Sequence, residues 1–248
     1  MLDTGLAGRT VLITGSAQGL GAALVRAFHA EGAYIAALDV DDAANRALAA
    51  SLDPDGDRVR AVHADLGDLA AVEAAHRAVR AWRPVDVLVN NAARPLAKPL
   101  WEITPEEWDE VFAVNLRAVF FLTRAVAGDM RERGRGRIVN MASIAGQTPR
   151  PTGAAYGSSK AGLIALSRVF AAELAGDGIT VNTVAPAMID TPMVRSVSPE
   201  ALAALTAQVP LGRIATPEEV ARVAVFLASQ ETFVTGATYD VNGGALMR

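Results

Sequence analysis

The sequence contains no cysteine, few aromatic residues and no excess of positive charge. The absence of cysteine excludes disulfide bonds, thiolate metal sites and a cysteine nucleophile. Among 248 residues, 23 are Lys or Arg and 27 are Asp or Glu, which leaves a formal net charge of −4. Proteins that bind nucleic acid carry a basic face or stripe. We therefore expect no nucleic-acid partner.

Long apolar runs and closely spaced histidines are also missing. No unbroken stretch of about 18 apolar residues, the length that crosses a bilayer, occurs. Residues 1–8 lack the basic start and apolar stretch of a signal peptide. The histidines His29, His63 and His76 stand far apart in the sequence. From these absences we predict a cytoplasmic protein with no membrane partner and no metal site.

What the sequence does have is a regular alternation of apolar strand-like segments with helical patterns. The strand-like segments are expected at residues 11–13, 34–38, 59–64, 85–89, 138–142, 179–184 and 238–241. No linker or change of composition divides the chain. We predict an α/β fold, a doubly wound parallel sheet of about seven strands with helices on both faces, in a single domain spanning residues 1–248.

The first strand-like segment runs into a glycine-rich turn that contains Gly15, Gly19 and Gly21 and precedes a helical pattern. Glycines in this place let the backbone approach a pyrophosphate, and the helix N-terminus offers N–H groups and the positive end of its dipole. The spacing is Gly-x-x-x-Gly-x-Gly instead of Gly-x-Gly-x-x-Gly, and no P-loop Lys-Ser/Thr pair closes the turn. We interpret it as a dinucleotide-binding turn.

Asp39 ends the second predicted strand, roughly 20 residues after the turn. A carboxylate in this place accepts hydrogen bonds from the adenosine ribose hydroxyls and repels a 2′-phosphate. No Arg or Lys lies between Gly15 and Gly21 or directly after Asp39 to pair with such a phosphate. The alternative is a helix cap or turn carboxylate beside Asp41 and Asp42. The ribose interpretation predicts NAD in preference to NADP.

Polar and small residues also follow the third and fourth predicted strands. Asp65 is interpreted either as an adenine contact or as a cap of the helix expected at residues 68–82, and the two interpretations are compatible. Asn90-Asn91-Ala92-Ala93 follows the fourth strand. Such side chains allow a ligand to approach the carboxyl ends of the strands, where open α/β sheets bind their ligands.

Tyr156 and Lys160 lie four residues apart at the start of a predicted helix, so their side chains share one helical face. A free Tyr titrates near ~10, and a neighbouring positive charge lowers that pKa. Bringing it close to neutrality requires roughly 4 kcal/mol of differential stabilisation. The pair is therefore a candidate acid/base, although Tyr-x-x-x-Lys alone is equally consistent with an ordinary surface helix.

Asn115 falls among apolar residues in the helix predicted to begin at Thr104. An unpaired buried amide costs roughly 1–3 kcal/mol, so this side chain needs partners. It is either a structural amide bonded to backbone or part of a site.

Taken in order, the glycine turn, Asp39, Asn90-Asn91-Ala92, Asn115, Ser143 and Tyr156-x-x-x-Lys160 resemble the short-chain dehydrogenase/reductase family, over residues 6–244. The resemblance implies a Rossmann-type fold and a catalytic tetrad. In that tetrad Tyr156 is the general acid/base, and Lys160 lowers its pKa and bonds the nicotinamide ribose. Ser143 orients the substrate oxygen, and Asn115 supports a water that relays protons from Lys160.

The resemblance also implies which residues contact the cofactor and the substrate. The cofactor contacts are Gly15, Ser16, Gln18, Gly19, Leu20, Asp39, Asp65, Leu66, Asn91, Ala92, Tyr156, Lys160, Pro186, Ile189 and Thr191. The substrate-pocket residues are Ala93, Arg94, Ile144, Gln147, Ala187, Met188 and Met193, with residues 187–210 as the lid. Ala93 and Ala187 stand where the family often has glycine, and each adds a methyl group beside the expected nicotinamide position.

Three functions are consistent with these features. The first is an NAD-dependent dehydrogenase that acts on a secondary alcohol or ketone in a small polyol, sugar or hydroxy acid. The second is a 3-oxoacyl reductase of carrier-bound or CoA-bound thioesters, against which Asp39 argues because such reductases usually take NADPH. The third is a non-catalytic NAD-binding regulator, against which the presence of both Tyr156 and Lys160 argues. The resemblance further implies a homotetramer, or a homodimer, formed through two long helices and the last strand.

Overall fold

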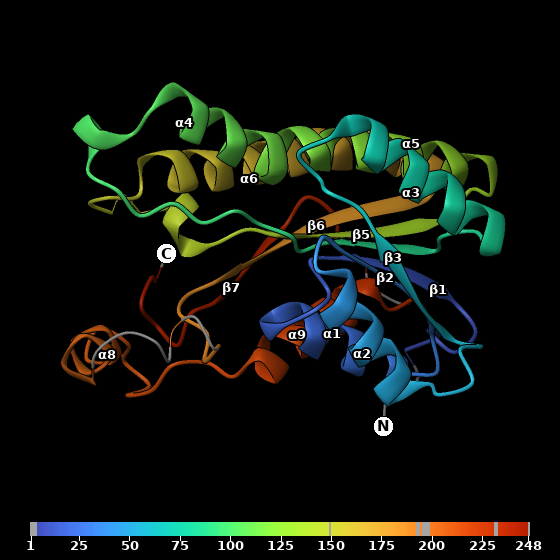
Figure 1. The fold of residues 1–248 in the computed structure, drawn as a ribbon, viewed down its shortest axis with the longest axis horizontal. Helices are drawn as coiled ribbons and strands as arrows, with labels where there is room; N and C mark the ends of the chain where they lie inside the picture. The colour runs from blue at the N-terminus through green and yellow to red at the C-terminus, as the bar shows by residue number, and fades with distance from the viewer. Residues whose placement is uncertain (1–3, 149, 192–193, 195–198, 231–232, 248) are drawn as a thin grey trace.

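The computed structural model describes residues 4–148, 150–191, 194, 199–230 and 233–247. In this part of the chain seven parallel strands form one sheet in the order β3-β2-β1-β4-β5-β6-β7 (Figure 1). The strands are β1 Thr10–Thr14, β2 Tyr34–Asp39, β3 Val59–His63, β4 Val87–Asn90, β5 Gly136–Met141, β6 Ile179–Pro186 and β7 Thr238–Val241. The predicted doubly wound parallel sheet of seven strands is therefore confirmed.

Helices cover both faces of the sheet (Figure 1). One face carries α1 Gly19–Ala30, α2 Asp42–Leu52 and α9 Pro217–Ala228. The other face carries α3 Leu69–Trp82, α4 Pro105–Phe112, α5 Val119–Glu132 and α6 Ala154–Leu174. Shorter elements are η1 Leu100–Glu102, the π-helical η2 Ala113–Ala118, η3 Ile144–Gly146, η4 Ala175–Asp177 and α8 Pro199–Thr206.

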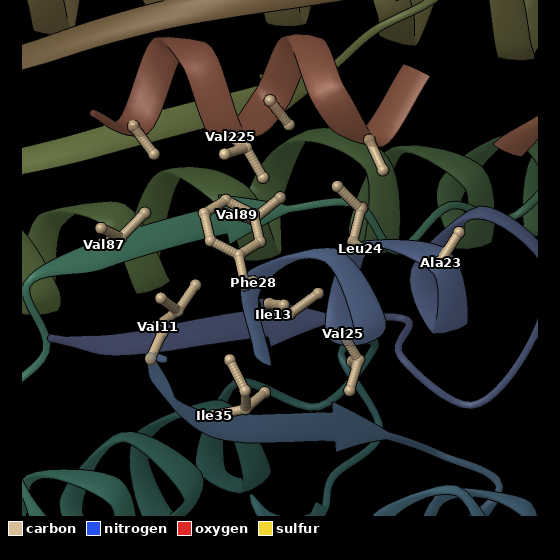
Figure 2. Packing of buried hydrophobic residues seen from close by; sticks show 14 of the residues in the cluster. Val11, Ile13, Ala23, Leu24, Val25, Phe28, Ile35, Val87, Val89 and Val225 are labelled. Carbon is tan, nitrogen blue, oxygen red and sulfur yellow. The ribbon is translucent and has the colours of Figure 1, made fainter. Parts of the chain in front are cut away.

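The central strand β1 shows why the sheet is buried on both sides. Val11 and Ile13 belong to the apolar cluster under α1, α2 and α9, where Phe28 fills the centre (Figure 2). Leu12 belongs to the cluster under α3, α5 and α6. Because successive side chains of a strand point to opposite faces, a continuous apolar run serves both layers.

One long helix bears on the expectation that no segment of the chain crosses a membrane. The structure joins α4, η2 and α5 into the 28-residue helix Pro105–Glu132, which contains an 18-residue apolar window with a mean hydropathy of 1.5. By length and composition this helix meets the requirements for crossing a membrane. Core helices of soluble proteins satisfy the same requirements, and 44% of the apolar window is buried here. The helix packs against α3 and α6.

The order of the strands determines where ligands can bind. It reverses between β1 and β4, which pair directly through Leu12 and Leu88. In an open parallel sheet such a reversal leaves a crevice beyond the carboxyl ends of the two strands. The glycine turn after β1 and the Asn-Asn-Ala segment after β4 both lie at this edge.

Candidate active site and cofactor groove

The glycine turn is packed so closely that Gly15 and Gly21 cannot be replaced by a larger residue without movement of the backbone. Gly15 has a positive φ of 65°, and a Cβ there would lie 2.7 Å from the Cα of Ala92. A Cβ at Gly21 would lie 1.7 Å from the carbonyl oxygen of Gly15. Glycine therefore lets α1 begin directly against the end of β1.

The N-terminus of α1 is left open by its own sequence. Gln18, the residue before the helix, makes no side-chain capping bond, and the first turn contains no acidic residue. The first N–H groups of a helix otherwise need a side chain, water or ligand as partner. The helix start thus offers donors and a positive dipole end to an anion such as a pyrophosphate.

A groove of about 600 Å³ lies at this edge of the sheet. That volume is within the usual range of ligand sites. It brings together many of the predicted cofactor contacts. Its lining includes Gly15, Gln18, Gly19, Leu20, Asp39, Asp65, Leu66, Asn91, Ala92, Ala93, Arg94 and Thr191.

Asp39 holds the glycine turn as well as lining the groove. Its Oδ2 accepts a hydrogen bond from the Ala17 N–H at 2.8 Å, and its Oδ1 accepts one from the Asp41 N–H at 2.9 Å. The cap of α2 is Asp41, which accepts from Ala44 N–H. Asp39 is therefore not the helix cap, and each carboxylate oxygen keeps a further acceptor site for a ligand.

Asp65 does not cap the helix that follows it. The N-cap of α3 is Asp68, which accepts from the Ala70 N–H, whereas Asp65 closes a tight turn by accepting from the Gly67 N–H at 2.8 Å. The capping interpretation of Asp65 was therefore wrong. Its exposed carboxylate lines the groove, and Leu66 beside it is buried.

Ser16 lies apart from the groove. Its side chain is fully buried, and its hydroxyl donates to Asn45 Oδ1 at 2.8 Å. Asn45 in turn donates to the Ala37 carbonyl oxygen, so Ser16 links α2 to the sheet beneath the glycine turn. The hydroxyl proton of Ser16 is therefore donated within the protein, to Asn45.

Thr14 is a residue of the site that sequence reasoning missed. Its Oγ1 accepts hydrogen bonds from the N–H groups of Asn91 and Ala92, at 3.0 and 3.1 Å. The Asn91 side chain donates back to the carbonyl oxygens of Thr14 and Gly15. These bonds join the two sides of the crevice. In the sequence Thr14 is visible only as the threonine directly before Gly15 at the start of the glycine turn.

Ser143 sits at the start of the short turn η3, directly after β5. Its Oγ accepts a hydrogen bond from the Ala145 N–H at 3.1 Å. The turn rests on α6 through two glycines: a Cβ at Gly146 would lie 2.6 Å from the Lys160 carbonyl carbon, and one at Gly157 would lie 2.9 Å from the Ala145 carbonyl oxygen. This packing brings Ser143 to Tyr156, whose hydroxyl interacts with the Ser143 side chain.

Burial dominates the electrostatics of Tyr156 and Lys160. Lys160 is 2% exposed, and desolvation lowers its pKa to about 8. Its Nζ donates to the Met141 carbonyl oxygen at 2.7 Å and lies 5.7 Å from the centre of the Tyr156 ring. The pKa of Tyr156 is raised by burial, and the hydrogen bond with Ser143 partly opposes that effect. Burial therefore outweighs the hydrogen bond in setting the tyrosine pKa.

Asn115 occupies the π-helical turn η2, an irregularity that often accompanies functional sites. The side chain is fully buried. Its Oδ1 accepts from the Arg94 N–H at 2.7 Å, and its Nδ2 donates to the Arg94 carbonyl oxygen and to Ser159 Oγ. Asn115 thus ties the loop after β4 to helix α6, one residue from Lys160.

The predicted substrate residues fall into separate places. Ala93 and Arg94 line the main groove, and the Arg94 guanidinium pairs with Glu110. Ala187 and Met188 line a smaller hollow of about 110 Å³. Ile144 is 3% exposed and belongs to the core. Met193 lies outside the described residues.

Gln147 has an internal partner that the sequence did not reveal. Its Nε2 donates to Asp240 Oδ1 on β7 at 2.8 Å. Because β6 lies between β5 and β7, this side chain crosses the carboxyl end of β6. The predicted contacts Pro186 and Ile189 lie at or just after that end: Pro186 is buried, and Ile189 forms a bridge with Ala215.

Known proteins resemble the chain over nearly all of its length. A family model described as enoyl-(acyl carrier protein) reductase matches residues 15–245. D-threitol dehydrogenase of Mycolicibacterium smegmatis is 39% identical over 246 residues, covering 98% of this chain and 94% of that protein.

Two solved structures have the same fold. A candidate NAD(P)-dependent gluconate 5-dehydrogenase from Beutenbergia cavernae, with NADP bound at low occupancy, is 38% identical with a TM-score of 0.91, covering 97% of each chain. The 3-ketoacyl-(acyl-carrier-protein) reductase from Brucella melitensis, complexed with NADH, is 32% identical with a TM-score of 0.90, covering 98% of this chain and all of that one. The chain therefore belongs to the short-chain dehydrogenase/reductase family and is an oxidoreductase of CH–OH or carbonyl groups that uses a nicotinamide cofactor.

Proposed function

We propose that the protein is an NAD(H)-dependent dehydrogenase of a secondary alcohol in a small polyol, sugar or hydroxy acid. The observation that carries the proposal is the cluster of Ser143, Tyr156 and Lys160 at the end of β5. This strand is the neighbour of β4, and the residues that follow β4 line the groove. The open start of α1 and the glycines against Ala92 suit a pyrophosphate in that groove. The similarity to threitol and gluconate dehydrogenases supports the substrate class.

Tyr156 is the proposed general acid/base, and Ser143 orients the substrate oxygen. In the oxidative direction the Tyr156 phenolate accepts the hydroxyl proton of the substrate while the carbinol carbon loses hydride. When bound, the nicotinamide cofactor accepts that hydride and adds a positive charge near the phenol. That charge acts with the buried Lys160 ammonium against the desolvation that raises the tyrosine pKa.

Asn115 has two compatible roles in this proposal. Its side chain positions the Arg94 backbone and Ser159, and the π-helical turn around it supports a water that relays protons from Lys160. The segment 187–210, which includes α8, is the proposed lid of the substrate pocket. We extend the proposal to one dinucleotide-binding and catalytic domain, a cytoplasmic location and a homotetramer.

Asp39 supports NAD as the preferred cofactor. Its carboxylate lines the groove and is fixed by two backbone N–H groups, so it cannot turn away from a 2′-phosphate without losing them. The exposed side chain of the next residue, Val40, offers a place for a cation. We expect Asp39→Ala combined with Val40→Arg to move the cofactor preference toward NADP. Unchanged selectivity for NAD would show that Asp39 does not bind the adenosine ribose.

Tyr156→Phe tests the chemistry. The variant should lose NAD-linked oxidation of a panel of secondary alcohols while it binds NADH with nearly unchanged affinity, measured by fluorescence titration. Residual turnover above a few per cent of the parent would assign the proton transfer to another group.

The second candidate is a 3-oxoacyl-thioester reductase, favoured by the similarity to the Brucella melitensis enzyme. The two candidates differ in measurable ways. Reduction of an acetoacetyl thioester with a clear preference for NADPH, together with no oxidation of polyols, would support the reductase. Binding of NAD without turnover of any alcohol, ketone or thioester would instead support a non-catalytic regulator.

A further inference from the structure

Four arginines gather at the edge of the sheet opposite the cofactor groove, where β1, β4 and β5 begin. Two adjoining hollows of about 210 and 530 Å³ open there. The charged residues that line them are Arg9, Arg83, Arg135, Arg137 and Asp86. Asp86 is the single carboxylate of this lining, so the described walls carry an excess of positive charge.

Two of these arginines, Arg137 and Arg83, are held by uncharged groups of the protein. Arg137 donates to the carbonyl oxygens of Gly136, Ser229 and Gln230, which holds its guanidinium in place. Arg83 donates to Thr10 Oγ1 and lies 3.6 Å from the centre of the Tyr34 ring. Neutral partners of this kind leave both positive charges uncompensated.

The other two arginines face one carboxylate oxygen without bonding it. Arg9 Nη1 lies 3.7 Å and Arg135 Nη2 lies 3.8 Å from Asp86 Oδ1, beyond hydrogen-bond distance. The other oxygen, Oδ2, accepts the Thr10 N–H at 3.1 Å. Within the described part of the chain, the guanidinium groups of Arg9 and Arg135 make no hydrogen bond and only these longer ion pairs. Each therefore keeps its forked donors for an oxyanion.

The electrostatics of Arg137 reflect the same excess of charge. Burial and, after it, the positive charge of Arg9 lower the pKa of Arg137. A single shared carboxylate does not cancel this repulsion. An anion that carries two or more charges would do so.

From this arrangement we propose a binding site for a phosphate-bearing anion between Arg9 and Arg135, on the face of the sheet edge remote from the catalytic residues. A phosphate group has several acceptor oxygens and suits two guanidinium forks. The adjoining hollows provide room for a second phosphate group, so pyrophosphate is the probe of choice. The site is independent of the proposed substrate.

Isothermal titration with pyrophosphate, at low ionic strength and with NADH present to fill the cofactor groove, tests the site. Arg135→Gln should raise the Kd at least about tenfold. Arg26→Gln is the matched control, because it removes one exposed positive charge from α1 and should leave the Kd unchanged. Asp86→Asn should lower the Kd several-fold, because it removes the competing negative charge.

Arg9→Gln should raise the Kd as Arg135→Gln does. If Arg9→Gln fails to fold, Arg135→Gln still tests the proposal. The Arg135 side chain is 57% exposed, so its replacement leaves the core intact. Equal Kd values for Arg135→Gln and Arg26→Gln, or no saturable binding to the parent protein at millimolar pyrophosphate, would overturn the proposal.

Discussion

Gly146 lies against the backbone of Lys160, with space for a hydrogen and no more: a Cβ at Gly146 would stand 2.6 Å from the carbonyl carbon of Lys160. The turn that carries Ser143 is thereby seated directly on the helix that carries Tyr156 and Lys160. Backbone contact therefore fixes Ser143 of η3 relative to Tyr156 and Lys160 of α6. Rotation of a side chain cannot change this arrangement.

Gly146→Ala should therefore separate η3 from α6. Forced overpacking costs roughly 1–3 kcal/mol, and a shift of about 1 Å at a reacting group can cost 10²-fold in rate. We expect a lower free energy of unfolding in urea and a kcat reduced by one to two orders of magnitude, with cofactor affinity little changed.

Gly128→Ala on α5 provides the comparison for that variant. No atom lies within 4 Å of a Cβ placed there, and the helix is exposed at this position. Alanine should stabilise the protein by roughly 0.5–1 kcal/mol because it restricts the unfolded chain. Similar kcat values for Gly146→Ala and Gly128→Ala would show that the contact between Gly146 and Lys160 does not position the catalytic groups.

Thr14→Val should weaken cofactor binding. Valine keeps the shape of Thr14 but removes the oxygen that accepts the N–H groups of Asn91 and Ala92. Each buried N–H left without a partner costs roughly 1–3 kcal/mol. We expect a higher Kd for NADH, measured by fluorescence, and a lower melting temperature.

Thr10→Val, at the other end of β1, controls for the loss of a buried hydroxyl. Thr10 is equally buried, and its Oγ1 accepts a bond from Arg83, far from the groove. It should reduce stability without changing the Kd for NADH. An equal loss of NADH affinity in both variants would mean that Thr14 acts only through the stability of the strand.

Lys160→Met should change how stability depends on pH. Burial lowers the folded-state pKa of Lys160 from 10.5 to about 8. Between these values the unfolded chain holds the proton and the folded chain does not, so stability rises as the pH rises through this window. Below pH 8 both states are charged and the full desolvation cost, about 3 kcal/mol, remains.

The measurement for Lys160 is urea unfolding of both proteins across pH 7–10.5. The parent should gain stability relative to Lys160→Met as the pH rises, and the variant should be inactive throughout. Parallel stability curves would show that Lys160 is solvated in the folded protein.

Local patterns predicted much of this structure because their causes are local. The helix predicted to begin at Thr104 does begin there, because the capping box of Thr104 and Glu107 is formed by two bonds between residues three apart. Asp39 ends β2 because the apolar run before it must be buried and a carboxylate must not be. The parallel topology follows from the alternation of these short strands with helices.

Hydrogen bonds between distant segments were not visible in the sequence. Thr14 bonds with Asn91 and Ala92, which lie more than 70 residues further along the chain. Gln147 bonds with Asp240 on the last strand. No periodicity encodes such pairs, because they depend on which strands become neighbours. The π-helical turn around Asn115 was also missed, since its sequence has the same apolar spacing as a regular helix.

Asn115 and Ser159 should prove energetically coupled. The Asn115 side chain makes three hydrogen bonds, two to the backbone of Arg94 and one to Ser159 Oγ, and it is fully buried. Asn115→Ala leaves these partners unsatisfied in a dry site, so we expect a loss of roughly 2–4 kcal/mol in unfolding free energy. Ser159→Ala removes one partner and should cost less.

A double-mutant cycle measures the interaction energy between Asn115 and Ser159 separately from their other contacts. If the Asn115–Ser159 bond couples the loop after β4 to α6, the double variant should lose at least about 0.5 kcal/mol less than the sum of the single losses. Because Ser159 Oγ also donates to the Tyr156 carbonyl oxygen, the cycle should appear in kcat as well as in stability. Additive losses in both quantities would mean that Asn115 acts on the Arg94 loop alone, and the water relay would then be tested by the pH profile of Asn115→Ala.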